Sequence, residues 1–118
     1  MDGIQKNITV SLRADEIMET LVQEGLFNNH QEAYRSAISV ALAQNLPLDS
    51  DFKMTKNKWD TAAVFYSSDS NVESLLLLKG IDKNKIVEAG KILAENGLRF
   101  LEHKRQSNSD LMKFLIAK

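Results

Sequence analysis

Residues 7–13 (NITVSLR) alternate polar and apolar side chains, a pattern typical of a half-buried β-strand. On such a strand Asn7, Thr9 and Ser11 point to one side, where an amide and two hydroxyl groups can donate and accept hydrogen bonds. Asn can pair bidentately with adenine in the DNA major groove, and Thr and Ser are short, adaptable donors and acceptors. The outward side of this strand is therefore the first candidate for a functional surface.

The apolar positions of this strand predict how it is covered. No second convincing strand follows in about the next forty residues, so its backbone groups have no obvious partner in their own chain. We expect it to pair with the same strand of a second copy, giving a homodimer whose two-stranded ribbon fits the major groove. Pairing of two dimers into a tetramer stays open. The predicted dimer core consists of Ile8, Val10, Leu12 and Ile38.

Two amphipathic helices are predicted directly after the strand. The spacing of apolar residues indicates a helix over residues 14–24, which Gly25 ends. Asn28 and Asn29 are suited to cap a second helix over residues 30–44. These helices are the elements that would hold the strand in place.

The rest of the chain is predicted to be separate from this unit. Residues 47–58 are polar and lack periodicity, so we interpret them as a linker between an N-terminal unit, residues 1–46, and a helical C-terminal domain, residues 59–118. The predicted fold class is mainly α: one strand paired across a dimer, two helices, and a helical C-terminal part.

Within the C-terminal part, residues 59–66 are compatible with a helix or a short strand, and the sequence leaves both open. A longer helix is predicted over residues 83–105. Gly97 lies inside it, where glycine lowers helix propensity by roughly 1 kcal/mol relative to alanine. We expect a kink or a close helix contact at that position.

The net charge of −1 hides an asymmetry between the two halves. Residues 1–50 hold three basic and seven acidic residues, a net charge of −4, whereas residues 51–118 hold twelve basic and nine acidic residues, a net charge of +3. Phosphate neutralisation dominates non-specific affinity for DNA. If the chain binds DNA, part of the electrostatic support must therefore come from the second half.

Several classes of function are disfavoured. The chain has no cysteine, and its two histidines, His30 and His103, lie far apart in the sequence, so no metal-ligand or cofactor motif is present. No nucleophile–base pattern, phosphate loop or paired carboxylates indicate catalysis, and we expect no enzyme activity. The apolar runs are too short for a membrane span and the first residues lack a signal pattern, so we expect a cytoplasmic location.

The order of strand, short helix, glycine turn and asparagine-capped helix is similar to that of the ribbon-helix-helix proteins, the superfamily of the Arc and methionine repressors, and particularly their antitoxins. The segments ITVSL and GLFNNHQEAYRSAI carry the resemblance, which covers residues 6–45. This sequence departs from the family pattern at Ala14, where proline is common, and at Gln31, where serine is common.

The resemblance implies an intertwined dimer with its ribbon in the major groove, where Asn7, Thr9 and Ser11 would read base edges. The alternation agrees, because it directs these three side chains away from the core. It also implies that a DNA phosphate binds the start of the second helix, at Asn28, Asn29 and His30. Lys6 and Arg13, at the ends of the ribbon, are the remaining expected phosphate contacts.

We therefore expect sequence-specific binding of double-stranded DNA, as a transcriptional repressor or an antitoxin-like autoregulator. The alternative is an interaction protein that does not bind DNA. In that case the ribbon is only a dimer clasp, and the C-terminal helices dock a larger protein partner through positions such as Leu76 and Phe100.

Overall fold

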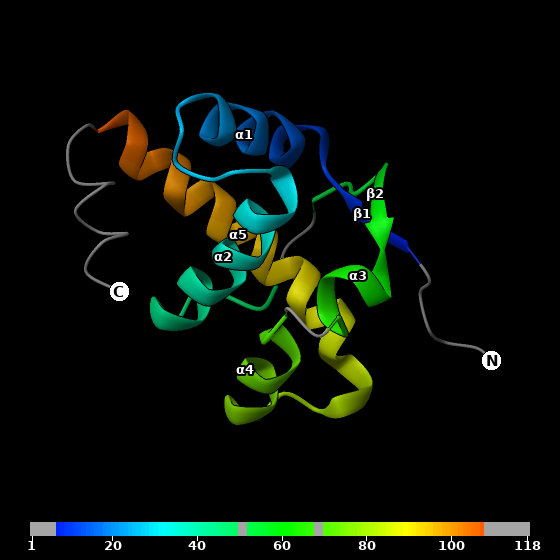
Figure 1. Cartoon of the computed structure of the whole chain (residues 1–118). Coiled ribbons are helices and arrows are strands. Elements are labelled where there is room, and N and C mark those ends of the chain that lie inside the picture. The colour runs from blue at the N-terminus through cyan, green and yellow to red at the C-terminus, as the bar shows by residue number, and fades with distance from the viewer. Residues whose placement is uncertain (1–6, 50–51, 68–69, 108–118) are drawn as a thin grey trace.

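The computed structural model describes residues 7–49, 52–67 and 70–107, and it is mainly helical with one small antiparallel sheet (Figure 1). In chain order the elements are β1 (Asn7–Val10), α1 (Leu12–Gln23), α2 (His30–Ala43), β2 (Lys56–Asp60), α3 (Thr61–Phe65), α4 (Val72–Leu78), a 3-10 turn (Lys83–Lys85) and α5 (Ile86–Gln106).

The expectation that β1 lacks a partner in its own chain is wrong. β1 pairs in antiparallel fashion with β2, which lies partly in the predicted linker and partly in the ambiguous segment after it. The sequence of β2, KNKWD, contains one large apolar residue, Trp59, because only one side of this short strand is covered. Trp59 packs edge-on against the buried ring of Tyr34 in α2, with 5.1 Å between ring centroids, and this contact holds β2 against the helices.

Ser11 begins α1 as its N-cap. Its backbone is extended, and its hydroxyl oxygen accepts a hydrogen bond from the backbone N–H of Ala14 at 3.0 Å. The helix thus begins two residues earlier than predicted, and it buries Ile17, Met18 and Leu21.

The prediction for α2 is confirmed. Asn29 is the N-cap, and its side chain accepts a hydrogen bond from the backbone N–H of Glu32 at 2.8 Å. The Glu32 carboxylate accepts in return from the backbone N–H of Asn28 at 2.7 Å. Together these bonds satisfy donors that a helix start leaves open.

Among the described residues, α2 and α5 form the most extensive contact between two helices (Figure 1). They cross at Gly97, where a Cβ atom would lie 2.0 Å from the carbonyl oxygen of Ala37. The close helix contact expected at Gly97 is therefore confirmed, and glycine is required there because the neighbouring group is backbone.

One hydrophobic core extends over both predicted parts of the chain. Ile8, Val10 and Ile38 are fully buried in the same cluster as residues of α3, α4 and α5, such as Val64 and Leu98. The core is therefore not divided at residues 47–58.

Candidate nucleic-acid interface

The outer face of the β1–β2 sheet is polar. Thr9 lies opposite Asn57 and Asn7 lies opposite Asp60, and residues directly opposite in an antiparallel pair share a face. Asn7, Asn57 and Asp60 are exposed and Thr9 is partly exposed. The other face is apolar, since Ile8 and Val10 are fully buried. The alternation predicted for the first strand is thus confirmed from Asn7 to Val10.

An irregularity in register shapes this face. Ile8 pairs with Trp59 but Thr9 pairs with Asn57, so Lys58 is an extra residue in β2. Its ammonium group turns to α1 and α2, where it donates to Asp15 Oδ1 at 2.7 Å and to His30 Nδ1 at 2.9 Å. Without this bulge, period-two alternation would direct Asn57 to the covered face.

Ser11 does not share the outer face with Asn7 and Thr9. It is 6% exposed, and its backbone N–H and its hydroxyl both donate to the carboxylate of Glu95 in α5, at 2.8 and 2.7 Å. Arg99 donates to the same carboxylate at 2.7 Å. The strand alternation ends at Val10 because the chain turns into α1, so the predicted base-reading position at Ser11 is a buried helix cap.

Leu12 is also placed differently from the prediction. Its side chain is 65% exposed at the start of α1, whereas the other three predicted dimer-core residues are buried inside a single chain. The reason for expecting a dimer through the strand is therefore removed, because β2 supplies the missing partner. The oligomeric state itself stays a prediction.

Basic residues border the sheet at the end where Val10 pairs with Lys56. Lys53 and Lys56 are exposed, and Lys56 contacts Asp15 Oδ2 at 3.0 Å. Partial burial raises the pKa of the Asp15 carboxyl, but hydrogen bonds and charge from Lys58 and Lys56 outweigh burial and hold this pKa below its ordinary value. Asp15 is therefore a charged carboxylate whose negative charge is balanced by two lysines of β2.

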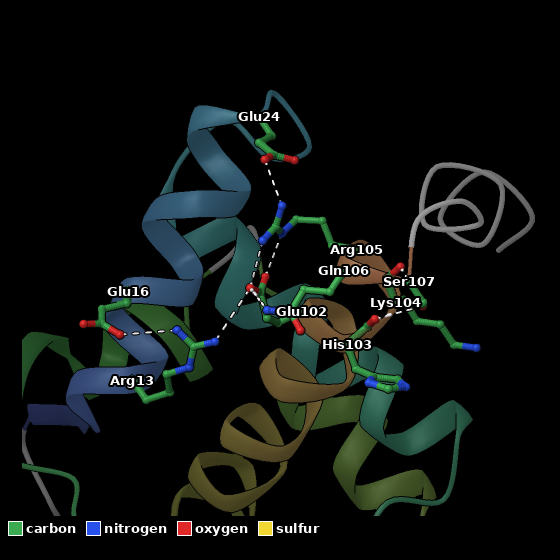
Figure 2. A network of polar contacts seen from close by, with 9 residues as sticks. All are labelled: Arg13, Glu16, Glu24, Glu102, His103, Lys104, Arg105, Gln106 and Ser107. Atoms are coloured by element: carbon green, nitrogen blue, oxygen red, sulfur yellow. Dashed lines mark hydrogen bonds and ion pairs between the residues drawn. The ribbon is translucent and has the colours of Figure 1, made fainter.

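Arg13 lies near the same end, on the first turn of α1. Figure 2 shows its guanidinium between Glu16, at 3.3 Å, and Glu102 of α5, at 3.7 Å. A hydrogen bond from Arg105 holds the pKa of Glu102 below its ordinary value against the effect of burial, and Arg105 also reaches Glu24 at the end of α1. Half of the Arg13 side chain stays exposed, so it can meet a phosphate only by leaving part of this network.

The start of α2 is the other predicted phosphate contact. Asn28 and Asn29 are exposed, and His30 is half-buried, with Nε2 2.8 Å from Glu19 Oε1. Asn29, His30, Gln31 and Trp59 line a shallow depression of about 400 Å³. The carboxylate of Glu32 already occupies part of the first turn, and a phosphate there would have to share that turn with it. The predicted contact at Lys6 lies outside the described residues.

The sequence interpretation missed Asn57, and it favoured a solvated charged face for Lys56 and Lys58 over contacts with nucleic acid. The signal that could have found them is the tripeptide KNK followed by Trp59, in which polar residues precede one aromatic anchor. Two acids of α5, Glu95 and Glu102, lie outside the apolar stripe of the helix in the sequence, and yet they are only 1% and 7% exposed.

Among the described residues, no group of three or more His, Cys, Asp or Glu side chains is arranged to hold a metal ion. No helix in residues 7–49, 52–67 and 70–107 has the length and apolarity to cross a membrane.

Comparison of the chain with protein-family models, with curated proteins and with solved structures finds no match.

Proposed function

We propose that this protein binds double-stranded DNA by inserting the β1–β2 sheet into the major groove. The observation that carries the proposal is the two-sided character of the sheet: Ile8 and Val10 are fully buried, and the opposite face consists of hydrogen-bonding side chains. A two-stranded ribbon has the width that the major groove admits. Ribbon-helix-helix proteins have a similar order of elements, but here a strand of the same chain completes the ribbon.

The charges of β2 support this assignment. The N-terminal half is acidic, and a ribbon made of two copies of β1 would bring only acidic halves to the DNA. Pairing with β2 instead brings residues of the positive half of the chain to the ribbon: exposed Lys53 precedes β2, and exposed Lys56 lies at its end, opposite Val10 and in contact with Asp15. Cations beside the groove neutralise phosphates and release counterions, which strengthens binding at low salt.

In this proposal Asn7 and Thr9 contact base edges. Arg13, Lys53 and Lys56 contact phosphates, together with the first turn of α2 at Asn28, Asn29 and His30. The biological role that fits best is a transcriptional repressor or an antitoxin-like autoregulator.

The test is selection of bound duplexes from a random library, followed by fluorescence-anisotropy titration of the selected duplex over a range of salt concentrations. We expect a selected sequence, and an affinity that falls steeply as salt rises. Lys53→Ala should weaken binding to all sequences and make the salt dependence shallower, whereas Thr9→Val should weaken binding to the selected duplex more than to a scrambled one. Absence of duplex binding at low salt would refute the proposal.

A second candidate function is docking of a protein partner on α4. Leu77 and Leu78 are 43% and 83% exposed, and Tyr66 before this helix is 48% exposed. Leu76, which the sequence indicated as a contact position, is fully buried and belongs to the core. This candidate predicts that Leu78→Lys abolishes a complex but leaves DNA binding unchanged, which co-purification and anisotropy measurements can separate.

A further inference from the structure

The two ends of the outer sheet face differ in charge. At one end Asn7 lies opposite Asp60, whose carboxylate would be repelled by DNA phosphates. At the other end Thr9 lies opposite Asn57, and neither side chain is charged; the next pair is buried Val10 and Lys56, whose ammonium group contacts Asp15. The Thr9–Asn57 end is therefore the part of the face that DNA phosphates would repel least.

Asn57 is the most versatile hydrogen-bonding side chain at that end. It is exposed, and its amide offers both a donor and an acceptor, which is the combination that pairs bidentately with adenine. Its position depends on the bulge at Lys58, which turns Asn57 outward and is itself fixed by Asp15 and His30. The contacts of Lys58 with α1 and α2 fix the backbone of Asn57, so the Asn57 amide group is not needed to hold the strand in place.

We propose that Asn57 is a specificity-determining residue that reads an adenine edge beside the base contacted by Thr9. This inference rests on the proposed DNA binding and adds a reading residue from the second strand. Because Asn57 and Thr9 come from different segments of one chain, the recognised sequence is asymmetric within a single copy of the protein. Asn7 lies two residues from Thr9, about 7 Å along the strand, and would read a neighbouring position.

The experiment compares base preferences of the full chain with those of Asn57→Ala and Asn57→Asp, by duplex selection and by anisotropy titration at one salt concentration. Asn57→Ala should reduce discrimination at one base pair by about ten- to a hundredfold, with preferences elsewhere unchanged. Asn57→Asp should shift the preference at that base pair from adenine towards cytosine, whose amino group donates to a carboxylate.

Asn84→Ala is the matched control, because Asn84 is an exposed asparagine on the 3-10 turn outside the sheet and should leave every preference unchanged. Circular dichroism of each variant checks that it folds. Unchanged preferences in both Asn57 variants, or a loss of affinity that is equal for all sequences, would overturn the role of Asn57 while DNA binding by the wild-type chain stands. A wild-type chain that binds no duplex would instead refute both proposals.

Discussion

Replacement of Gly97 by alanine tests the crossing of α2 and α5 most directly. The added methyl would lie 2.0 Å from the carbonyl oxygen and 2.7 Å from the carbonyl carbon of Ala37, whereas ordinary contacts of a Cβ begin near 3.4 Å. The helices would have to separate by more than about 1 Å, because the obstruction is backbone and cannot rotate away.

The expected magnitude follows from two opposing effects. Overpacking of this kind costs about 3 kcal/mol, and the higher helix propensity of alanine returns roughly 1 kcal/mol. We expect the free energy of unfolding to fall by about 2 kcal/mol and the Tm by about 10 °C. Urea unfolding followed by circular dichroism measures the first quantity, and a thermal scan measures the second.

Gly90→Ala is the matched control in the same helix. Its added methyl would meet the ring of Phe65 at 2.4 Å, and a side chain can yield more easily than a carbonyl group. Gly90→Ala should therefore be less destabilising than Gly97→Ala, and adding Ala37→Gly should not rescue the Gly97 variant. A Gly97→Ala protein that is as stable as the wild type would refute the close approach of the two helices.

Three further predictions concern α1 and the contacts that join it to the rest of the chain. Ser11→Ala removes the helix cap and one donor to buried Glu95, and should lower the unfolding free energy by about 2 kcal/mol, with Ser11→Thr as the milder control. Leu12→Gln should change it by less than about 0.5 kcal/mol, because Leu12 is exposed; a large loss would indicate that a second copy covers it. Since the pKa of Glu102 is lowered in the folded state, its contribution is complete above the unfolded value and is lost as pH falls through the folded value. Unfolding curves should therefore show stability declining below about pH 4, and Glu102→Gln should decline less; equal slopes would contradict this role.

Local signals predicted the elements that depend on neighbouring residues. The cap at Asn29 and the spacing of apolar residues were sufficient to predict α2, and the alternation from Asn7 to Val10 predicted β1. The predicted strand is too long at its end, because Ser11 continues the polar pattern of the strand but also suits a helix cap. Both interpretations are compatible with a serine, and only the turn of the chain distinguishes them.

The pairing of β1 could not be predicted by the same means. β2 has four polar residues out of five, and its single anchor, Trp59, is also compatible with a helix face. Its strand conformation depends on Tyr34 and β1, which are distant in the sequence. The burial of Glu95 also depends on donors from a distant segment, since Ser11 lies 84 positions before it. Sequence periodicity alone therefore predicts that Glu95 lies on the surface.

The contacts of β1 with β2 and α5 also constrain the order in which the chain can fold during synthesis. The first half leaves the ribosome with only part of the core that contains Ile8 and Val10, because later segments supply the remaining core residues and the partner strand of β1. Contacts between such distant segments slow folding and leave apolar surface open in the nascent chain. The first half thus reaches its native state only after α5 has been translated, and the two halves are expected to fold together.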